Sequence, residues 1–98
     1  MYVKIHKSYR NVVAICDLEL MGKRFESGIF QLDVKENFFR GDKVSEDEAI
    51  LIMRRMLAED ATFNIVGKKS VNAAIKAEII SSDSVRKIAG IPFALVLG

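Results

Sequence analysis

Four consecutive residues, Ser45-Glu46-Asp47-Glu48, define the start of a helix more strictly than any other segment of the chain. The Ser45 hydroxyl can accept a hydrogen bond from the backbone N–H of Glu48, and the Glu48 carboxylate can accept one from the N–H of Ser45, as in a capping box. Acidic residues in the first turn also favour the positive end of the helix dipole. The sequence therefore predicts a helix from Glu46 to about Glu59. Its expected buried stripe consists of Ala49, Ile52, Met53, Met56 and Leu57.

Alternating and β-branched segments predict the strands. We expect strands at residues 2–7, 12–16, 29–34, 85–89 and 91–97, with the first two joined as a hairpin and a short helical turn at 17–22. Residues 61–66 fit either a short buried strand or a turn. After Gly67, Ser70 is expected to cap a second helix, because apolar residues follow it at helical spacing.

The chain length of 98 residues fits one domain, so we expect residues 1–98 to form a single unit. Half of the residues are hydrophobic, which is enough for a core without disulfides. The order of expected elements predicts an α+β fold with a mostly antiparallel sheet of about five or six strands. The two main helices are expected in a single layer on one face, with solvent on the other.

Cysteine content and hydropathy indicate the cellular location of the protein and whether it enters a membrane. Cys16 is the only cysteine, so no internal disulfide can form. The longest apolar runs, at 49–53 and 91–97, are far shorter than the ~20 residues that span a bilayer. The alternating N-terminal segment also differs from the continuous apolar core of a signal peptide. We expect a cytoplasmic protein without membrane association, and no pattern indicates a cofactor.

Several short motifs, taken in order, resemble an archaeal family of small proteins known only as domain of unknown function 424. They are Met1-Tyr2-Val3-Lys4-Ile5-His6-Lys7-Ser8, Val12-Val13-Ala14-Ile15-Cys16-Asp17, Leu20-Met21-Gly22-Lys23-Arg24-Phe25, Asn64-Ile65-Val66-Gly67 with Val71 and Ala74, and Gly90-Ile91-Pro92. The family carries polar residues, including a histidine, after the proline, where Phe93 and Leu95 stand here. The resemblance implies an archaeal, cytoplasmic source and brings no activity, cofactor or site.

His6 and Cys16 are the only histidine and cysteine, and they lie on the two strands of the expected first hairpin. As neighbours they would form a thiol–imidazole pair. The alternative is a surface histidine and a buried, apolar cysteine, which we favour because no third group is placed to orient the imidazole. A metal site needs three or four converging ligands, and no spacing indicates one. Enzymatic activity therefore has no support in the residue pattern.

Basic residues in the expected loops are the candidate contacts for an anion or for RNA. Gly67-Lys68-Lys69-Ser70 opens the second helix without matching a phosphate-binding P-loop. The candidate contacts are Lys68, Lys69 and Ser70 there, with Lys23, Arg24, Lys7 and Arg10 in other loops. Arg86-Lys87 is a further basic pair, and Tyr9 offers a stacking face. An ordinary mixed-charge surface is the alternative, because thirteen acidic residues are interleaved.

Apolar residues outside the regular pattern are the candidates for a partner interface. Phe38 and Phe39 are adjacent, so on regular structure they cannot both point the same way. The segment 91–97 is uncharged, which fits either a buried closing strand or the seam of a homodimer. The candidate interface residues are Phe38, Phe39, Phe93 and Leu95.

These observations leave two functional hypotheses. The first is a non-catalytic binding module that contacts RNA or a ribonucleoprotein, based on the basic loops. The second is a homodimeric or protein-interaction module with no nucleic-acid role, based on the apolar C-terminal segment and the two phenylalanines.

Overall fold

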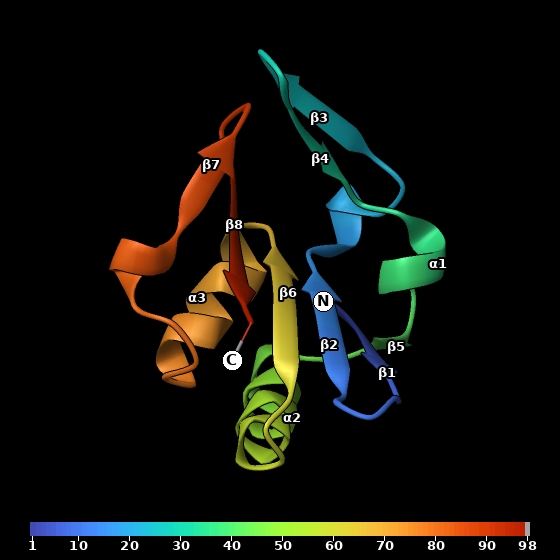
Figure 1. Ribbon diagram of the computed structural model, residues 1–98, viewed down its shortest axis with the longest axis vertical. Coiled ribbons are helices and arrows are strands. Elements are labelled where there is room, and N and C mark those ends of the chain that lie inside the picture. The colour runs from blue at the N-terminus through green and yellow to red at the C-terminus, as the bar shows by residue number, and fades with distance from the viewer. Residues whose placement is uncertain (98) are drawn as a thin grey trace.

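The computed structural model describes residues 1–97 as a twisted six-stranded sheet with a separate two-stranded hairpin (Figure 1). The strand order in the main sheet is β5-β1-β2-β6-β8-β7. Every neighbouring pair is antiparallel except β2 and β6, which are parallel. The strands are β1 (Tyr2–His6), β2 (Val12–Cys16), β5 (Asp42–Lys43), β6 (Thr62–Val66), β7 (Arg86–Ile88) and β8 (Ile91–Val96). The predicted α+β fold with a mostly antiparallel sheet is confirmed.

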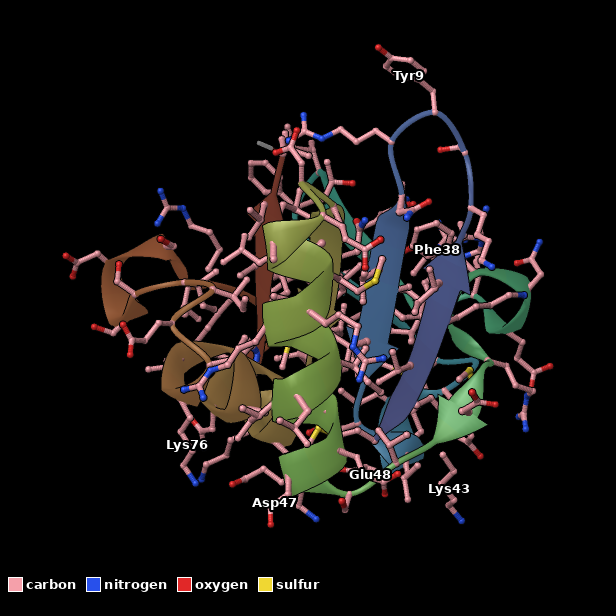
Figure 2. The ribbon with its side chains drawn as sticks, turned by 90° about the horizontal axis from the view of Figure 1, so that it is seen from below. Tyr9, Phe38, Lys43, Asp47, Glu48 and Lys76 are labelled. Atoms are coloured by element: carbon pink, nitrogen blue, oxygen red, sulfur yellow. The ribbon has the colours of Figure 1, made fainter. Side chains whose placement is uncertain are left out.

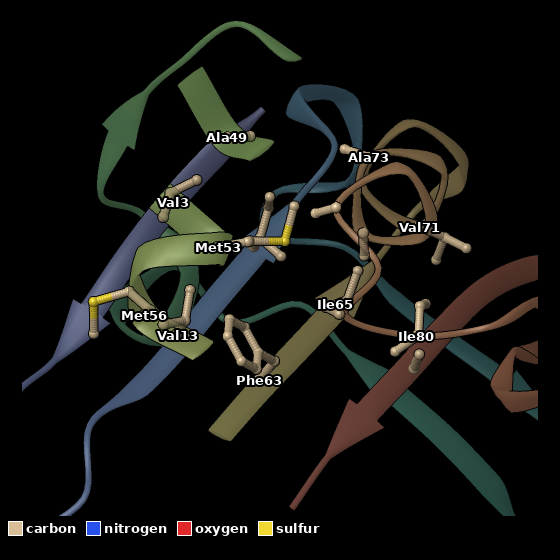
Figure 3. Close-up of a cluster of buried hydrophobic side chains, with 14 of the residues drawn as sticks. Val3, Val13, Ala49, Met53, Met56, Phe63, Ile65, Val71, Ala73 and Ile80 are labelled. Atoms are coloured by element: carbon tan, nitrogen blue, oxygen red, sulfur yellow. The ribbon is translucent and has the colours of Figure 1, made fainter. Parts of the chain in front are cut away.

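Helices α2 (Glu46–Ala58) and α3 (Lys68–Lys76) cover one face of the main sheet. Apolar side chains of both helices pack there against residues of β1, β2, β6 and β8 (Figure 3). Phe63, Ile65 and Met53 in this layer are fully buried. The helix-side cluster includes Val3, Val13, Ile15, Ala49, Met53, Met56, Phe63, Ile65, Val71, Ala73 and Ala74. Within residues 1–97, no helix has the length and apolar character needed to cross a membrane.

The capping box at the start of α2 is confirmed. The N–H of Glu48 donates to Ser45 Oγ at 3.2 Å, and the N–H of Ser45 donates to Glu48 Oε1 at the same distance. The predicted stripe is partly right, because Ala49, Met53 and Met56 are buried and Ile52 is half-buried. Leu57 is exposed and was wrongly included. The buried residues Ala49, Met53 and Met56 define a narrower stripe, and Leu57, directly after Met56, lies outside it.

The opposite face of the main sheet is partly covered, so the expectation of solvent there was wrong. A hairpin of β3 (Arg24–Ser27) and β4 (Phe30–Asp33) and the short helix α1 (Glu36–Phe39) lie over it. Their apolar side chains meet alternate residues of β2 and β6 in a hairpin-side cluster. That cluster contains Ala14, Cys16, Leu20, Val34, Phe39 and Val66, with Tyr2, Phe25, Leu32, Phe38 and Phe93 packed against it.

The segment 61–66, which fitted either a strand or a turn, contains β6 (Thr62–Val66) in the middle of the sheet. Its Phe63 and Ile65 face the helices, and Val66 faces the hairpin-side cluster. A strand that packs on both faces lacks clear alternation, which explains the ambiguous pattern. The predicted strand at 29–34 is the shorter β4, and it pairs with β3 outside the main sheet.

The chain closes with the hairpin β7–β8, as expected from residues 85–97. Ala89 and Gly90 connect the two strands with φ of 52° and 79°. Positive φ at both central residues is the geometry of a type I′ turn, which matches the twist of a hairpin. Pro92 is the second residue of β8 and pairs with Lys87, so it lies near the strand start, as predicted.

Candidate functional site

A recess of about 680 Å³ lies where β2 and β6 end, beside α3 and the β7–β8 hairpin. The parallel pairing of β2 and β6 places both carboxyl ends at one edge of the sheet, a common position for ligand sites. Figure 1 shows α3 and the β7–β8 hairpin on the same side of β6. The polar residues lining the recess are Asp17, Glu19, Lys68, Asn72, Ser82 and Lys87. The larger apolar ones are Leu20, Val71, Ile75, Val85, Ile91 and Pro92.

Asp17 connects the end of β2 to the start of α3. Its carboxylate is 2% exposed and accepts hydrogen bonds from the backbone N–H groups of Lys69 and Ser70, at 3.0 and 2.8 Å. The Ser70 hydroxyl donates to the same carboxylate at 2.7 Å. A buried carboxylate is stable here because charge-assisted hydrogen bonds and the positive end of the helix replace its hydration.

The prediction that Ser70 caps α3 was wrong. The N-cap is Gly67, the helix begins at Lys68, and Ser70 is a buried residue of the first turn. The expected anion position at the helix start is filled by the protein's own Asp17 carboxylate. Any anion bound in this region must therefore depend on lysine side chains instead of the amides of Lys69 and Ser70.

The recess combines an apolar wall with separated charges. Lys68 stands at the start of α3 and Lys87 on β7, and both side chains are exposed. Glu19 is also exposed, whereas the Asp17 charge is engaged by α3. With Asn72 and Ser82 as hydrogen-bonding groups, this lining suits a ligand that carries an anionic group, an apolar surface and hydrogen-bond donors.

The predicted basic residues fall at two ends of the molecule. Lys68 and Lys69 follow β6, and Lys23 and Arg24 follow η1 (Leu18–Leu20), the short 3₁₀ segment after β2. Lys7 and Arg10 lie in the β1–β2 turn, at the other end of β2. A five-residue strand separates the two groups by roughly 15 Å. The structure therefore does not gather the seven predicted residues into one patch.

The β1–β2 turn is itself only partly available for contacts. Arg10 Nε donates to the Asp60 carbonyl at 2.7 Å, and Arg10 Nη2 forms an ion pair with Asp60 Oδ1 at 3.0 Å. Tyr9 points away from the body of the molecule at the tip of the turn (Figure 2). Its ring lies far from the lysines of the recess.

Three of the four predicted interface residues pack within the chain. Phe39 is buried in the hairpin-side cluster, and Phe38 and Phe93 pack against it. Phe38 also stacks on the His6 ring with centroids 4.6 Å apart, and it lies beside β1 (Figure 2). Leu95 is 53% exposed, on the sheet face opposite the helices. β8 lies between β6 and β7, so it is an internal strand.

The hypothetical pair of His6 and Cys16 does not form. In the β1–β2 register His6 is opposite Val12 and Cys16 is opposite Tyr2, at the two ends of the hairpin. His6 Nε2 instead contacts the Phe38 carbonyl oxygen at 2.8 Å. Burial raises the pKa of the Cys16 thiol from 9.0 to about 12, with the neighbouring Asp17 charge adding to the effect. The thiol is therefore protonated and a poor nucleophile at neutral pH.

Sequence reasoning missed most of the recess and the exposed tip of the β3–β4 hairpin. Asn72, Ser82 and Glu19 had no signal of their own, and Lys87 was only part of a basic pair. The tip residues Ile29 and Phe30 are 91% and 63% exposed. The adjacent Gly28 was the available signal, because a glycine between two alternating segments marks a hairpin turn. Within residues 1–97, no cluster of three or more potential metal ligands is present.

Comparisons with known proteins place this geometry in a family without an assigned activity. A crystal structure described as an uncharacterized conserved protein from Methanopyrus kandleri matches with a TM-score of 0.88. The match covers 97% of this chain and 88% of that one at 22% identity, so it shows a shared fold. No curated protein matches significantly. The family model described as Protein of unknown function (DUF424) matches residues 6–98, and the chain belongs to this family.

Proposed function

We propose that this protein is a non-catalytic module that binds single-stranded RNA, free or within a ribonucleoprotein, at the end that holds the recess. The observation that carries the proposal is the presence of Lys68 and Lys87 in one concave, partly apolar lining. Lysine side chains neutralise phosphates, and apolar concave surfaces shelter unstacked bases. Single-stranded RNA presents both groups together.

Further exposed basic side chains at this end support the proposal. Lys69 follows Lys68 at the start of α3, Lys23 precedes β3, and Arg24 is the first residue of β3. Lys7 and Arg10 belong to the proposed surface only for an RNA long enough to reach the other end of β2. Binding through such side chains depends on counterion release, so its affinity must fall as salt rises.

The role is assigned to binding because three side chains of the types used in catalysis, Asp17, Cys16 and His6, are engaged within the chain. Asp17 is held by three hydrogen bonds from the start of α3. Cys16 is buried with a raised pKa, and His6 stacks on Phe38 at the far end of β1. None of the three is placed as a base or nucleophile facing a bound ligand.

Fluorescence anisotropy with a labelled mixed-sequence RNA tests the proposal. The unmodified protein should bind, and the logarithm of its affinity should fall linearly with the logarithm of salt concentration between about 50 and 200 mM. A Lys68→Ala/Lys87→Ala variant should bind more weakly, and its salt slope should become shallower by about 0.7 for each phosphate that the variant no longer neutralises. Both side chains are exposed, so the fold should be retained.

The control variant is Lys43→Ala/Arg55→Ala, which removes the same charge from exposed positions that do not line the recess. It should keep the affinity and most of the salt slope. Equal losses of affinity in the two variants would mean that net charge alone drives binding. No binding by the unmodified protein at about 50 mM salt, where phosphate contacts are strong, would exclude the RNA function.

A protein-interaction role, in particular homodimer formation, is the second candidate, and the exposed apolar side chains favour it. Ile29 and Phe30 form the tip of the β3–β4 hairpin, and Leu95 is exposed on β8. The hairpin projects from the main sheet (Figure 1), so its tip is accessible to another molecule. Light scattering coupled to gel filtration should then give the mass of a dimer, and a Phe30→Ser/Leu95→Ser variant should give that of a monomer. A monomer at high concentration for the unmodified protein would contradict the dimer.

A further inference from the structure

We propose that the recess binds one nucleotide unit, with the base against its apolar wall and the phosphate at Lys68 and Lys87. The choice of ligand class rests on the RNA function proposed above. The lining of the recess indicates where one nucleotide unit is held and which groups contact it. The same chemistry occurs in an RNA chain and in a free nucleoside 5′-monophosphate. The volume of about 680 Å³ lies within the roughly 300–1,000 Å³ typical of small-ligand sites.

The apolar wall has two parts from distant segments of the chain. Val71 and Ile75 are four residues apart and therefore lie on the same face of α3. Val85, Ile91 and Pro92 come from the β7–β8 side of the recess. Aliphatic groups from two elements around one hollow suit a flat ring with apolar faces. A nucleobase removed from its stack provides such a ring.

Hydrogen-bonding side chains accompany this wall. Asn72 directly follows Val71 and is exposed on α3. Ser82 is the first residue of the η2 segment (Ser82–Ser84), which leads to β7. A side-chain amide has both donors and an acceptor, and a hydroxyl can serve as either. These groups match the mixed donors and acceptors on the edge of a base.

The charges of the recess distinguish a nucleotide from a simple anion. Lys68 and Lys87 attract an anion, whereas the exposed Glu19 carboxylate repels it. In a nucleotide the negative charge is confined to the phosphate. The ribose hydroxyls and base N–H groups are uncharged and can donate hydrogen bonds to a carboxylate. The lining therefore suits a nucleotide better than inorganic phosphate.

NMR titration of the isotope-labelled protein with each of the four ribonucleoside 5′-monophosphates tests this inference directly. At millimolar ligand, we expect saturable shifts confined to the amides of Lys68, Asn72, Lys87 and Gly90 and their neighbours. Inorganic phosphate should bind at least about tenfold more weakly. Shifts confined instead to Lys23 and Arg24, which do not line the recess, or equal affinity for phosphate, would overturn the inference.

An Asn72→Trp variant fills the recess from an exposed position while leaving both lysines in place. Its nucleotide affinity should fall by about tenfold or more. Asn37→Trp is the matched control, because Asn37 is an exposed residue of α1 that does not line the recess. The control variant should titrate like the unmodified protein. Unchanged nucleotide affinity in Asn72→Trp would refute the site.

The RNA measurement separates failure of this inference from failure of the proposed function. If the recess holds one nucleotide of a bound RNA, Asn72→Trp should weaken RNA binding while the salt slope stays the same. RNA binding of normal affinity in Asn72→Trp would leave the RNA function standing and exclude the recess from it. Nucleotide binding in a protein that does not bind RNA would exclude the RNA function and assign the recess to free nucleotides.

Discussion

Gly67 is the residue that allows the start of α3 to approach Asp17. Its φ of 109° is one that side chains with a Cβ rarely adopt. A Cβ at this position would also collide with the Asp17 carboxylate. The absence of a side chain at Gly67 is thus what permits the two hydrogen bonds from the amides of Lys69 and Ser70.

We predict that Gly67→Ala destabilises the protein by at least about 1–3 kcal/mol, the cost of backbone strain alone. The collision with Asp17 should add to that loss. Gly28→Ala is the control, because Gly28 has a φ of 62° and a Cβ there would meet no atom within 4 Å. Urea unfolding of both variants measures the difference. Equal losses of stability would show that Asp17 moves aside without cost.

The buried Cys16 thiol should make the stability of the protein depend on pH in the alkaline range. Its folded-state pKa of about 12 lies above the ordinary value of 9.0, because burial disfavours the thiolate. Between these values the folded state binds more protons than the unfolded state, so the free energy of unfolding must fall as pH rises from about 9 to 12. Below pH 9 this contribution is fully present.

The comparison with a Cys16→Ala variant isolates this contribution from the titration of lysines and tyrosines. Chemical unfolding at a series of pH values should give a steeper loss of stability above pH 9 for the unmodified protein than for the variant. The constant offset due to the smaller side chain does not affect this slope. Parallel curves would contradict the assigned pKa.

At the scale of single elements, α2 was predictable because its signals are local. The capping box and the acidic first turn lie within four residues, and their hydrogen bonds need no tertiary partner. The hairpin β3–β4 and helix α1 lacked such signals. β3 is polar except for Phe25, and α1 has only four residues, so their positions depend on packing against the sheet.

The contribution of the α2 cap to the free energy of unfolding can be measured. Ser45→Ala removes the acceptor of the Glu48 N–H, and we expect a loss of about 0.5–2 kcal/mol of stability. Ser81→Ala is the matched control. Ser81 is the exposed N-cap of η2, and its side chain makes no capping hydrogen bond. Thermal unfolding followed by circular dichroism should show a lower melting temperature for Ser45→Ala and little change for Ser81→Ala. The reverse order would refute the role of the cap.

At the scale of the whole molecule, the recess could not be predicted because its residues are far apart in the sequence. Asp17, Lys68 and Lys87 become neighbours of one hollow only because β2 and β6 are parallel and β8 pairs beside them. No spacing in the sequence encodes that arrangement. The local charge of Lys68 made it a candidate contact in the sequence. The accompanying prediction of a free anion position at the start of the helix was wrong, because the Asp17 carboxylate occupies that position.

The same arrangement joins the two apolar clusters into one unit. β2 and β6 contribute Ile15 and Ile65 to the helix-side cluster, and Cys16 and Val66 to the hairpin-side cluster. Adjacent residues of one strand point to opposite faces, so neither cluster can lose its order without disturbing the strands that support the other. We therefore predict that residues 1–98 unfold as a single domain in one cooperative transition.

Two probes report the two faces separately. Circular dichroism at 222 nm follows α2 and α3, and tyrosine fluorescence follows Tyr2, which packs against the hairpin-side cluster, while Tyr9 is already exposed. Leu20→Ala should destabilise the protein by about 2–5 kcal/mol and Ile65→Val by about 0.5–1.5 kcal/mol. Each variant should shift the transitions seen by both probes equally, although Leu20 and Ile65 lie in different clusters. If Leu20→Ala lowered only the fluorescence transition, the hairpin face would be a separate folding unit and the single-domain prediction would be wrong.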